Sequence, residues 1–346
     1  MVAFRTGTVD ALLAERRGLQ RVTVDGQRAY VLTDLIGEVA VGDHVVVNTT
    51  AVDLGLGTGG WHVVHWNLTR ERRDEPGPGH IMKLRYTSLQ VDTGSYEEHE
   101  PTDAQAEDGL DGLPVVVAGL HSLVAPIAAA VRQSRRGARI AYVMTDDAAL
   151  PLVLSDLVAD LTASGILDVT ITAGQAFGGD HEAVNVASGL WAARHRLDAD
   201  LAIVAMGPGN VGTGTTLGHA ALGQVPVIDL AGRLGGEVTL ALRASGVDAR
   251  DRHRGLSHHS TTVLRLAGGP LTVAVPGRWR DLLDPQLAEI DGAHRVEHVA
   301  AREVLGDLRD AGIELRSMGR RAADDPCFVD CAAAAGQLAA AQVTGP

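Results

Sequence analysis

The chain has 346 residues, of which 45% are hydrophobic and only 3% aromatic, and its formal net charge at pH 7 is −13. This length allows a large core and favours two domains over one. Seven acidic residues lie between Glu97 and Asp111 without a Lys or Arg among them, which leaves about −6 for the rest of the chain. Because no basic stripe is present, we expect no nucleic-acid partner.

The distribution of apolar residues indicates a cytoplasmic protein with no membrane partner. No run of about 18 uncharged apolar residues occurs, and the N-terminal stretch MVAFRTGTVDALL lacks the apolar region of a secretion signal. The two cysteines, Cys327 and Cys331, are four residues apart on a predicted helix and are too few for a disulfide framework. We interpret them as packed apolar side chains rather than as a metal or redox pair.

The N-terminal part predicts a compact β-rich, barrel-like domain over residues 1–93. Short β-like runs alternate with glycine turns, and Asp25-Gly26 between two of them is a hairpin signal. The runs are 20–24, 29–33, 43–48 and 61–66. Alternation in HIMKLRYTSLQVD predicts a further strand over 80–92, with Lys83 and Arg85 on one face.

Residues 94–112, GSYEEHEPTDAQAEDGLDG, are acidic and rich in turn formers. This composition predicts an exposed loop or linker. A solvated loop and a docking segment for a partner both remain open.

The remainder, 113–346, predicts a doubly wound α/β domain with a mostly parallel sheet. Continuous apolar runs alternate with segments of helical length, which is typical of βαβ units. The runs are 114–118, 139–144, 168–172 and 201–206, the helical segments are 123–135, 151–163 and 181–195, and further apolar runs predicted as strands are 225–230, 271–275 and 294–299.

The glycine-rich loop in MGPGNVGTGT follows one of these predicted strands. Its residues Gly207, Gly209, Asn210, Gly212 and Gly214 are candidates for holding an anion on backbone N–H groups before a helix that begins soon after. The spacing Gly207-x-Gly209-x-x-Gly212, with Asp229 further on, also fits a dinucleotide-binding fingerprint, although Pro208, Gly218 and Gly223 depart from it. A tight turn without ligand is the third interpretation.

Polar residues after several predicted strands are expected to meet at one edge of the sheet. These are His121, Asp146, Asp180, His181 and Asn210. Ser122 also follows a strand, but the flanking small residues of a hydrolase nucleophile turn are missing. For Ser122 and Asp180 a role as helix caps is the simpler interpretation.

Histidines gather in RHRGLSHHS, as His253, His258 and His259. Adjacent residues diverge on a helix or strand, so we do not expect His258 and His259 to bind one ion as equivalent ligands. No recognised metal-binding spacing is present, yet Asp146, Asp180, His181, His219 and His258 from separate loops remain compatible with a metal site. General acid/base catalysis and a purely structural role are the alternatives.

Five strings of the chain resemble a bacterial protein family of unknown function, known from actinobacteria and firmicutes. They are GHIMKLRYTSLQ (79–90), AGLHS (118–122), ITAGQAFGGDHEAVN (171–185), MGPGNVGTGT (206–215) and RHRGLSHHS (252–260). The resemblance implies a common fold across nearly the whole chain. It implies no activity and no catalytic residue.

Our favoured hypothesis is an enzyme that acts on a small anionic molecule, a class that includes phosphorylated molecules, at the sheet edge. The glycine loop holds the anion, and Lys83 and Arg85 neutralise it from the first domain; a solvated strand face is the alternative for these two. The predicted catalytic residues are His121, Asp146, His181 and His258. No metal ligand or cofactor is assigned, and a homo-oligomer stays open. The rival hypotheses are a metal-dependent hydrolase and a non-catalytic effector-binding or assembly protein.

Overall fold

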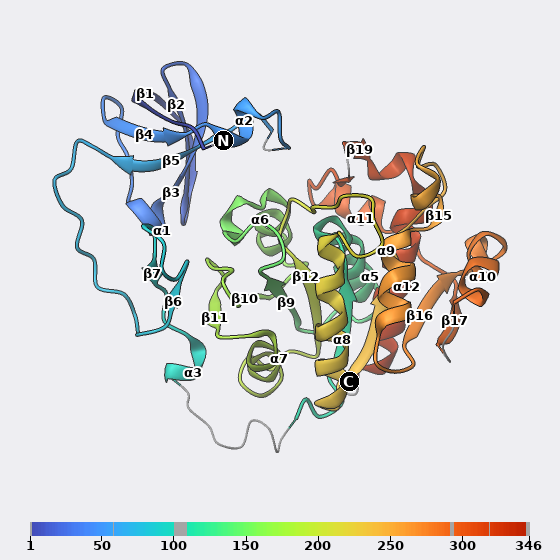
Figure 1. Ribbon diagram of the computed structural model, residues 1–346. Coiled ribbons are helices and arrows are strands. Elements are labelled where there is room, and N and C mark those ends of the chain that lie inside the picture. Colours follow the sequence, from blue (N-terminus) through green and yellow to red (C-terminus); the bar gives the residue numbers. More distant parts are fainter. Residues whose placement is uncertain (1, 58, 100–108, 291–293, 318, 344–346) are drawn as a thin grey trace. The chain divides into compact units, whose positions relative to one another are not determined.

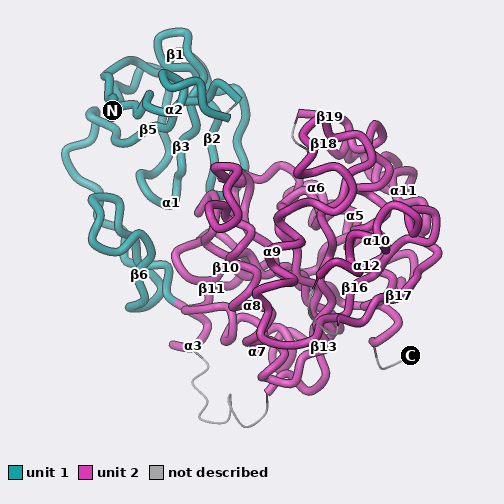
Figure 2. Tube along the Cα trace, turned by 45° about the vertical axis from the view of Figure 1, so that its right-hand side comes forward, with its two compact units in different colours: residues 1–94 teal, residues 95–346 magenta. Residues whose placement is uncertain are grey.

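The computed structural model describes residues 2–57, 59–99, 109–290, 294–317 and 319–343. The chain divides into two compact units, residues 1–94 and 95–346, which are coloured separately in Figure 2. Residues 100–108 of the acidic segment that we predicted as a loop or linker lie outside the described residues. Before it, Tyr96–His99 form the short helix α3.

Five strands of the first unit form a closed barrel in the order β1-β2-β3-β5-β4 (Figure 1). They are β1 (Phe4–Arg16), β2 (Leu19–Val24), β3 (Gln27–Leu32), β4 (His44–Asn48) and β5 (His62–Asn67), accompanied by the short helices α1 (Thr33–Ile36) and α2 (Thr50–Asp53). Alternate residues point inward, so Val9, Val22 and Val45 fill the interior and are at most 1% exposed. The predicted barrel-like domain is confirmed, although the longest strand, β1, was not predicted.

The hairpin predicted at Asp25-Gly26 joins β2 to β3, and both residues have positive φ, 47° and 74°. This left-handed backbone is the conformation that a tight two-residue turn between twisted strands requires. Register shifts within β1 let that strand bend and pair with β2 along one part and with β4 along another.

The strand predicted over 80–92 is wrong. Only β6 (Met82–Lys83) and β7 (Val91–Asp92) are extended, and they pair with each other. Between them Leu84 and Tyr86 have φ of 51° and 60°, a conformation that no strand accommodates. The Thr87 N–H donates to the Leu84 carbonyl over 3.2 Å, which closes a turn. Local alternation therefore did not translate into a strand.

The second unit contains an eight-stranded sheet in the order β11-β10-β9-β12-β8-β13-β16-β17, and every neighbouring pair is parallel. Its strands are β8 (Pro114–Ala118), β9 (Ile140–Thr145), β10 (Val169–Ala173), β11 (His181–Ala183), β12 (Leu201–Met206), β13 (Glu237–Ala241), β16 (Thr272–Pro276) and β17 (Arg295–Val299). The residues of β8, β9, β10 and β12 are all buried, as their continuous apolar runs indicate. The predicted doubly wound α/β architecture is confirmed.

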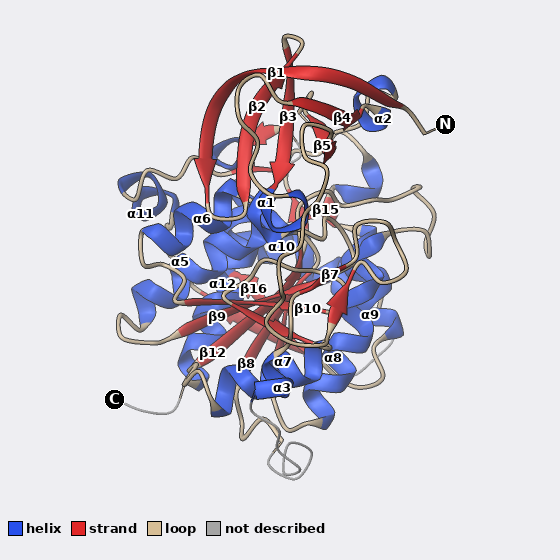
Figure 3. Cartoon of the chain, turned by 90° about the vertical axis from the view of Figure 1, so that its left-hand side faces the viewer, coloured by secondary structure: helices blue, strands red, loops and turns tan. Residues whose placement is uncertain are grey.

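Helices cover both faces of this sheet, as Figures 1 and 3 show. One face packs against α5 (Val124–Ser134), α6 (Asp156–Ala163), α11 (Leu305–Asp310) and α12 (Pro326–Gln342). The other packs against α7 (Val186–His195), α8 (Gln224–Arg233), α9 (His258–Leu266) and α10 (Arg280–Ala288). Within the central strands, side chains alternate between the two apolar cores.

The prediction of a strand at 225–230 is wrong, because these residues belong to α8. Pro226 falls in the first helical turn, where the missing N–H of proline costs no hydrogen bond. The strand that follows is β13, which was not predicted. Two short antiparallel pairs complete the unit: β14 (Ala244–Ser245) with β15 (Gly255–Leu256), and β18 (Arg316–Ser317) with β19 (Arg320–Arg321).

Helix α12 is rich in alanine and packs closely on α5 and on the neighbouring strands β8, β13 and β16. The approach to α5 is tightest at Gly336, where a Cβ atom would lie 2.4 Å from the carbonyl oxygen of Ile127. Cys327 and Cys331 are buried free thiols on this helix, as predicted.

Candidate functional site

The carboxyl ends of four neighbouring strands, β9, β12, β8 and β13, point to the same edge of the sheet. The chain leaves β9 toward α6 on one face but leaves β12 toward α8 on the opposite face, and β8 and β13 diverge in the same way. Such divergence opens a crevice outside the strand ends, where ligands of α/β proteins bind. The loops after these strands therefore supply the candidate site.

The glycine loop after β12 is a small hairpin. Gly212 pairs with His219 in an isolated antiparallel bridge, and α8 begins only at Gln224. The prediction that a helix follows the glycines directly is therefore wrong. Asp229, the predicted ribose-binding acid, lies on α8 and accepts a hydrogen bond from the Gly268 N–H over 2.9 Å. The structure describes every residue of this loop. The loop therefore lacks the arrangement of strand, glycine turn and helix that dinucleotide-binding folds have.

The same loop packs tightly against the loop that follows β9. A Cβ atom on Gly207 would lie 2.4 Å from the carbonyl oxygen of Ala149, and the Ala149 N–H donates to the Pro208 carbonyl over 3.0 Å. Next to it, the side-chain oxygen of Asn210 is buried without a hydrogen-bond partner. An unsatisfied buried acceptor of this kind is uncommon in native proteins, and a bound ligand is one way to satisfy it.

His121 follows β8 and links three elements of the edge. Its Nε2 lies 2.6 Å from the Ser155 hydroxyl, and its Nδ1 lies 3.1 Å from the Tyr142 hydroxyl and 3.2 Å from the Met206 carbonyl. Burial lowers the pKa of His121 to about 4. The ring is therefore neutral at pH 7, and both nitrogens are already engaged in the protein.

The other predicted edge residues are spread along the sheet. Asp146 follows β9 and accepts a hydrogen bond from the Gln175 N–H over 2.8 Å. Asp180 accepts from the backbone and side chain of Thr170. His181 lies on β11, five strand positions from β13, a separation of about 24 Å at the usual strand spacing. The structure therefore does not bring His181 together with the residues after β13.

Lys83 and Arg85 do not share a strand face, because the strand predicted for them is absent. Lys83 lies on the two-residue strand β6 and is 1% exposed, whereas Arg85 is exposed in the turn that follows. Both belong to the first unit. Their action on an anion in the second unit stays a prediction.

Four histidines form a cluster beside the glycine loop. His219 ends that loop, His253 precedes β15, and His258 and His259 open α9 behind the N-cap Ser257. The His219 and His259 rings stack with centroids 3.9 Å apart, and the His258 ring lies 4.4 Å from His259 and 5.3 Å from His219. We refer to His219, His253, His258 and His259 as the histidine cluster.

The rings of the histidine cluster are held neutral. Burial lowers the pKa of all four, to about 3 for His253 and about 2 for His259, and the positive charge of Arg243 lowers these two further. Neutral imidazoles are the form that binds metal ions and accepts protons.

Arg243 follows β13 and is the central cation of the site. Its side chain is 7% exposed, and its Nη1 donates to Nδ1 of His259 over 2.8 Å. Among the described residues it forms no ion pair. Burial lowers its pKa to about 10, so that it remains charged at pH 7. A buried guanidinium without a carboxylate partner is unusual, because charges are seldom buried unpaired.

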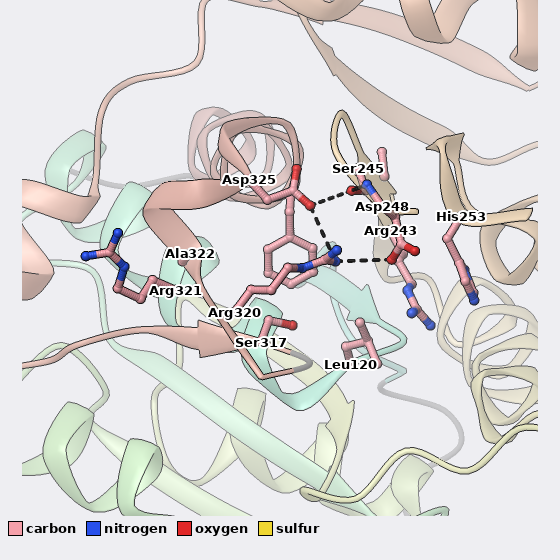
Figure 4. A pocket seen from close by; sticks show the side chains of 12 residues that line it. Leu120, Arg243, Ser245, Asp248, His253, Ser317, Arg320, Arg321, Ala322 and Asp325 are labelled. Carbon is pink, nitrogen blue, oxygen red and sulfur yellow. Dashed lines mark hydrogen bonds and ion pairs between the residues drawn. The ribbon is translucent and has the colours of Figure 1, made fainter. Parts of the chain in front are cut away.

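Arg243 lines a pocket that lies between β14 and β19 (Figure 4). This pocket contains two buried carboxylates. Asp248 accepts hydrogen bonds from Arg250 at 2.9 Å and from Arg320 at 3.1 Å, and the pairing with Arg250 holds the pKa of Asp248 far below its usual value. Asp325 accepts a hydrogen bond from the Ser245 hydroxyl over 2.5 Å. Both carboxylates are therefore already engaged by partners other than Arg243.

The glycine loop, the histidine cluster, Arg243 and Arg252 lie close together. A Cβ atom on Gly212 would lie 3.8 Å from Nε2 of His259, and one on Gly214 would lie 3.5 Å from the Arg252 guanidinium. Of the predicted site residues, the structure therefore brings Gly212 next to the histidine cluster that contains His258. We did not expect His258 and His259 to bind one ion as equivalent ligands, yet a ring nitrogen of each lies within 4.8 Å of the other and of His219.

Sequence reasoning missed Arg243 entirely and gave His259 no role. Arg243 is a lone arginine after an apolar run, so only its burial without an acidic partner marks it. His259 was visible in RHRGLSHHS, and the density of polar residues in that string was the available signal.

The chain belongs to the family described as "Protein of unknown function (DUF3866)", whose match covers residues 28–336. The match confirms the resemblance to an uncharacterised family. No curated protein matches the chain. Among the described residues, no helix combines the length and apolar character needed to cross a membrane.

Proposed function

We propose that this protein is an enzyme that acts on a small anionic molecule at the carboxyl edge of its parallel sheet. The observation that carries the proposal is Arg243, a buried cation that forms no ion pair among the described residues and feels the Asp248 carboxylate of the same pocket only beyond ion-pair distance. Keeping an ion from water without a counter-ion costs several kcal/mol. That cost is offset when an anion from outside binds the guanidinium.

The neighbours of Arg243 supply the other functions that such a site needs. Arg252 beside Gly214 adds a second positive charge, and the unpartnered Asn210 oxygen on the same loop accepts a donor group of the substrate. His258 is neutral and lies beside His259, which Arg243 contacts, so His258 can exchange protons with a bound molecule. His121 acts at a distance by holding the strand ends and the start of α6 together.

Substitution of Arg243 by Met in the full-length protein tests the proposal. In a buffer free of phosphate and sulfate, Arg243→Met should be at least as stable as the wild type, because a well-packed apolar side chain replaces an unpaired charge. Addition of inorganic phosphate or pyrophosphate should raise the melting temperature of the wild type. An anion present at 100 times its Kd stabilises the fold by about 2.7 kcal/mol. The Arg243→Met variant should show no such rise.

Arg265→Met is the matched control, because Arg265 is an exposed arginine of α9 in the same part of the unit. It should respond to both anions as the wild type does. The proposal is wrong if Arg243→Met responds like the wild type, or if it is destabilised without anions as the loss of a structural residue would predict.

A metal-dependent hydrolase is the second candidate, and the ring nitrogens of His219, His258 and His259 favour it. Three imidazoles with a fourth position open to water are a common set of ligands for catalytic zinc.

A further inference from the structure

Three side chains of the histidine cluster bring ring nitrogens close together. Because the His219 and His259 rings are stacked at 11°, one of them has to rotate before both bind one ion. His219, His258 and His259 each present one nitrogen, and these nitrogens all lie within 4.8 Å of one another. His219 comes from the glycine loop, whereas the other two come from the first turn of α9. Two separate segments of the chain thus meet at this point.

His219 and His258 lack the well-formed hydrogen bonds that buried imidazoles normally make. The Thr216 backbone acts on His219, but neither ring nitrogen of His219 and not Nε2 of His258 has a partner at hydrogen-bond geometry, and His219 is only 6% exposed. An unsatisfied buried polar atom costs about 1–3 kcal/mol. Burial, which outweighs the effect of the Thr216 backbone, also lowers the pKa of His219, so its lone pairs are available at neutral pH.

Arg243 opposes metal binding at this point in two ways. Its N–H donates to Nδ1 of His259, so the proton of the neutral His259 ring sits on Nε2, and that nitrogen cannot bind a metal until the proton moves. A metal-bound His259 carries its proton on Nδ1, which no longer accepts from a guanidinium. In addition, Arg243, Arg250 and Arg252 make the surroundings positive, as their lowering of the His258 pKa reflects.

An anion removes both obstacles. Once Arg243 donates to a bound anion, Nδ1 of His259 is free to take the proton and Nε2 to bind the metal. The negative charge of the anion also offsets the added dication. We propose that His219, His258 and His259 form a site for a divalent metal ion of the zinc class, and that an anion bound by Arg243 strengthens metal binding. The coupling rests on the proposed function, whereas the metal site does not.

The ligand set indicates the metal. Three imidazoles without a carboxylate suit Zn²⁺ and related ions such as Co²⁺, whereas Mg²⁺ and Ca²⁺ prefer oxygen ligands. With three protein ligands, one coordination position stays open for water or for an oxygen of the bound anion.

The test is titration of the metal-free full-length protein with Co²⁺, followed by its visible absorption, and with Zn²⁺ by competition against a chromogenic chelator. We expect one ion per chain in the wild type and at least a tenfold loss of affinity in His219→Ala and in His219→Gln, which keeps a side chain of similar size. His44→Ala, which removes an exposed histidine of β4, should bind the metal like the wild type.

Sulfate is the anion probe, because it binds these metals weakly in solution. Sulfate should raise the Zn²⁺ affinity of the wild type about tenfold, within the usual range of coupling between sites. Arg243→Met should bind Zn²⁺ more tightly than the wild type without sulfate and should not respond to sulfate. If no stoichiometric ion binds, or if His219→Ala and His219→Gln bind it unchanged, the metal site is refuted. If sulfate and Arg243→Met leave the metal affinity unchanged, the coupling is refuted. The anion response of the metal-free protein tests the proposed function separately.

Discussion

Replacement of His121 by Gln should make the protein less sensitive to acid. In the folded protein His121 is half-buried at the sheet edge and hydrogen-bonded on both ring nitrogens, and burial lowers its pKa from 6.5 to about 4. Between these two pH values the unfolded chain binds a proton that the folded protein does not. The neutral His121 ring therefore makes its full contribution to the free energy of unfolding above pH 6.5. This contribution is lost as the pH falls toward 4.

The size of the effect follows from the shift. Each pKa unit corresponds to 1.36 kcal/mol, so the full shift amounts to about 3.4 kcal/mol and the loss at pH 4.5 to about 2.6 kcal/mol. His253 and His259 also have lowered pKa values and destabilise the folded protein in acid. They are present in both proteins, so their contributions cancel when the variant is compared with the wild type.

Urea unfolding at pH 7.5 and pH 4.5 measures the effect. The free energy of unfolding should fall less for His121→Gln than for the wild type, by about 2–3 kcal/mol, whatever the variant loses at pH 7.5. His44→Gln, which changes an exposed histidine, should follow the wild type. Equal pH dependence of His121→Gln and wild type would refute the reasoning.

Two further predictions concern α12. Gly336→Ala should destabilise the protein by about 1–3 kcal/mol in urea unfolding, because the new Cβ meets the Ile127 carbonyl at 2.4 Å, whereas Gly137→Ala, with open space around it, should cost far less. Cys327 and Cys331 should not react with Ellman's reagent until the protein unfolds, since their mutual hydrogen bond and burial raise the pKa of the Cys331 thiol. Rapid labelling of the native protein would contradict this.

The parallel sheet could be predicted because each of its central strands has a local sequence that is typical of a buried strand. PVVVA and LAIVAM are short, continuous and apolar, and buried parallel strands require such runs. The run VPVIDL looks alike but is helical, since a short, mainly apolar run fits a helix as well as a strand. At 80–92 the alternating pattern predicted a strand, but the folded backbone forms two turns there. The alternating pattern does not indicate these turns.

The sequence identified several residues of the site but did not show how the site residues are arranged in space. The glycines were identified from the loop after a predicted strand, and His258 from the gathering of histidines in RHRGLSHHS. His181 was grouped with them because the sequence contains no record of strand order, which places β11 at the outer edge of the sheet. Arg243 differs from any surface arginine only in what surrounds it. Such three-dimensional properties depend on segments far apart along the chain.

The position of α12 has a consequence for synthesis. This helix covers β8, β13 and β16, yet it is made about 200 residues after β8. A nascent chain on the ribosome therefore carries an open apolar surface over the middle of its sheet until residues 326–342 emerge. Surfaces of this kind are where incomplete chains aggregate and where chaperones bind. Translation that stops before residue 326 should yield aggregated or chaperone-bound protein rather than a smaller folded domain.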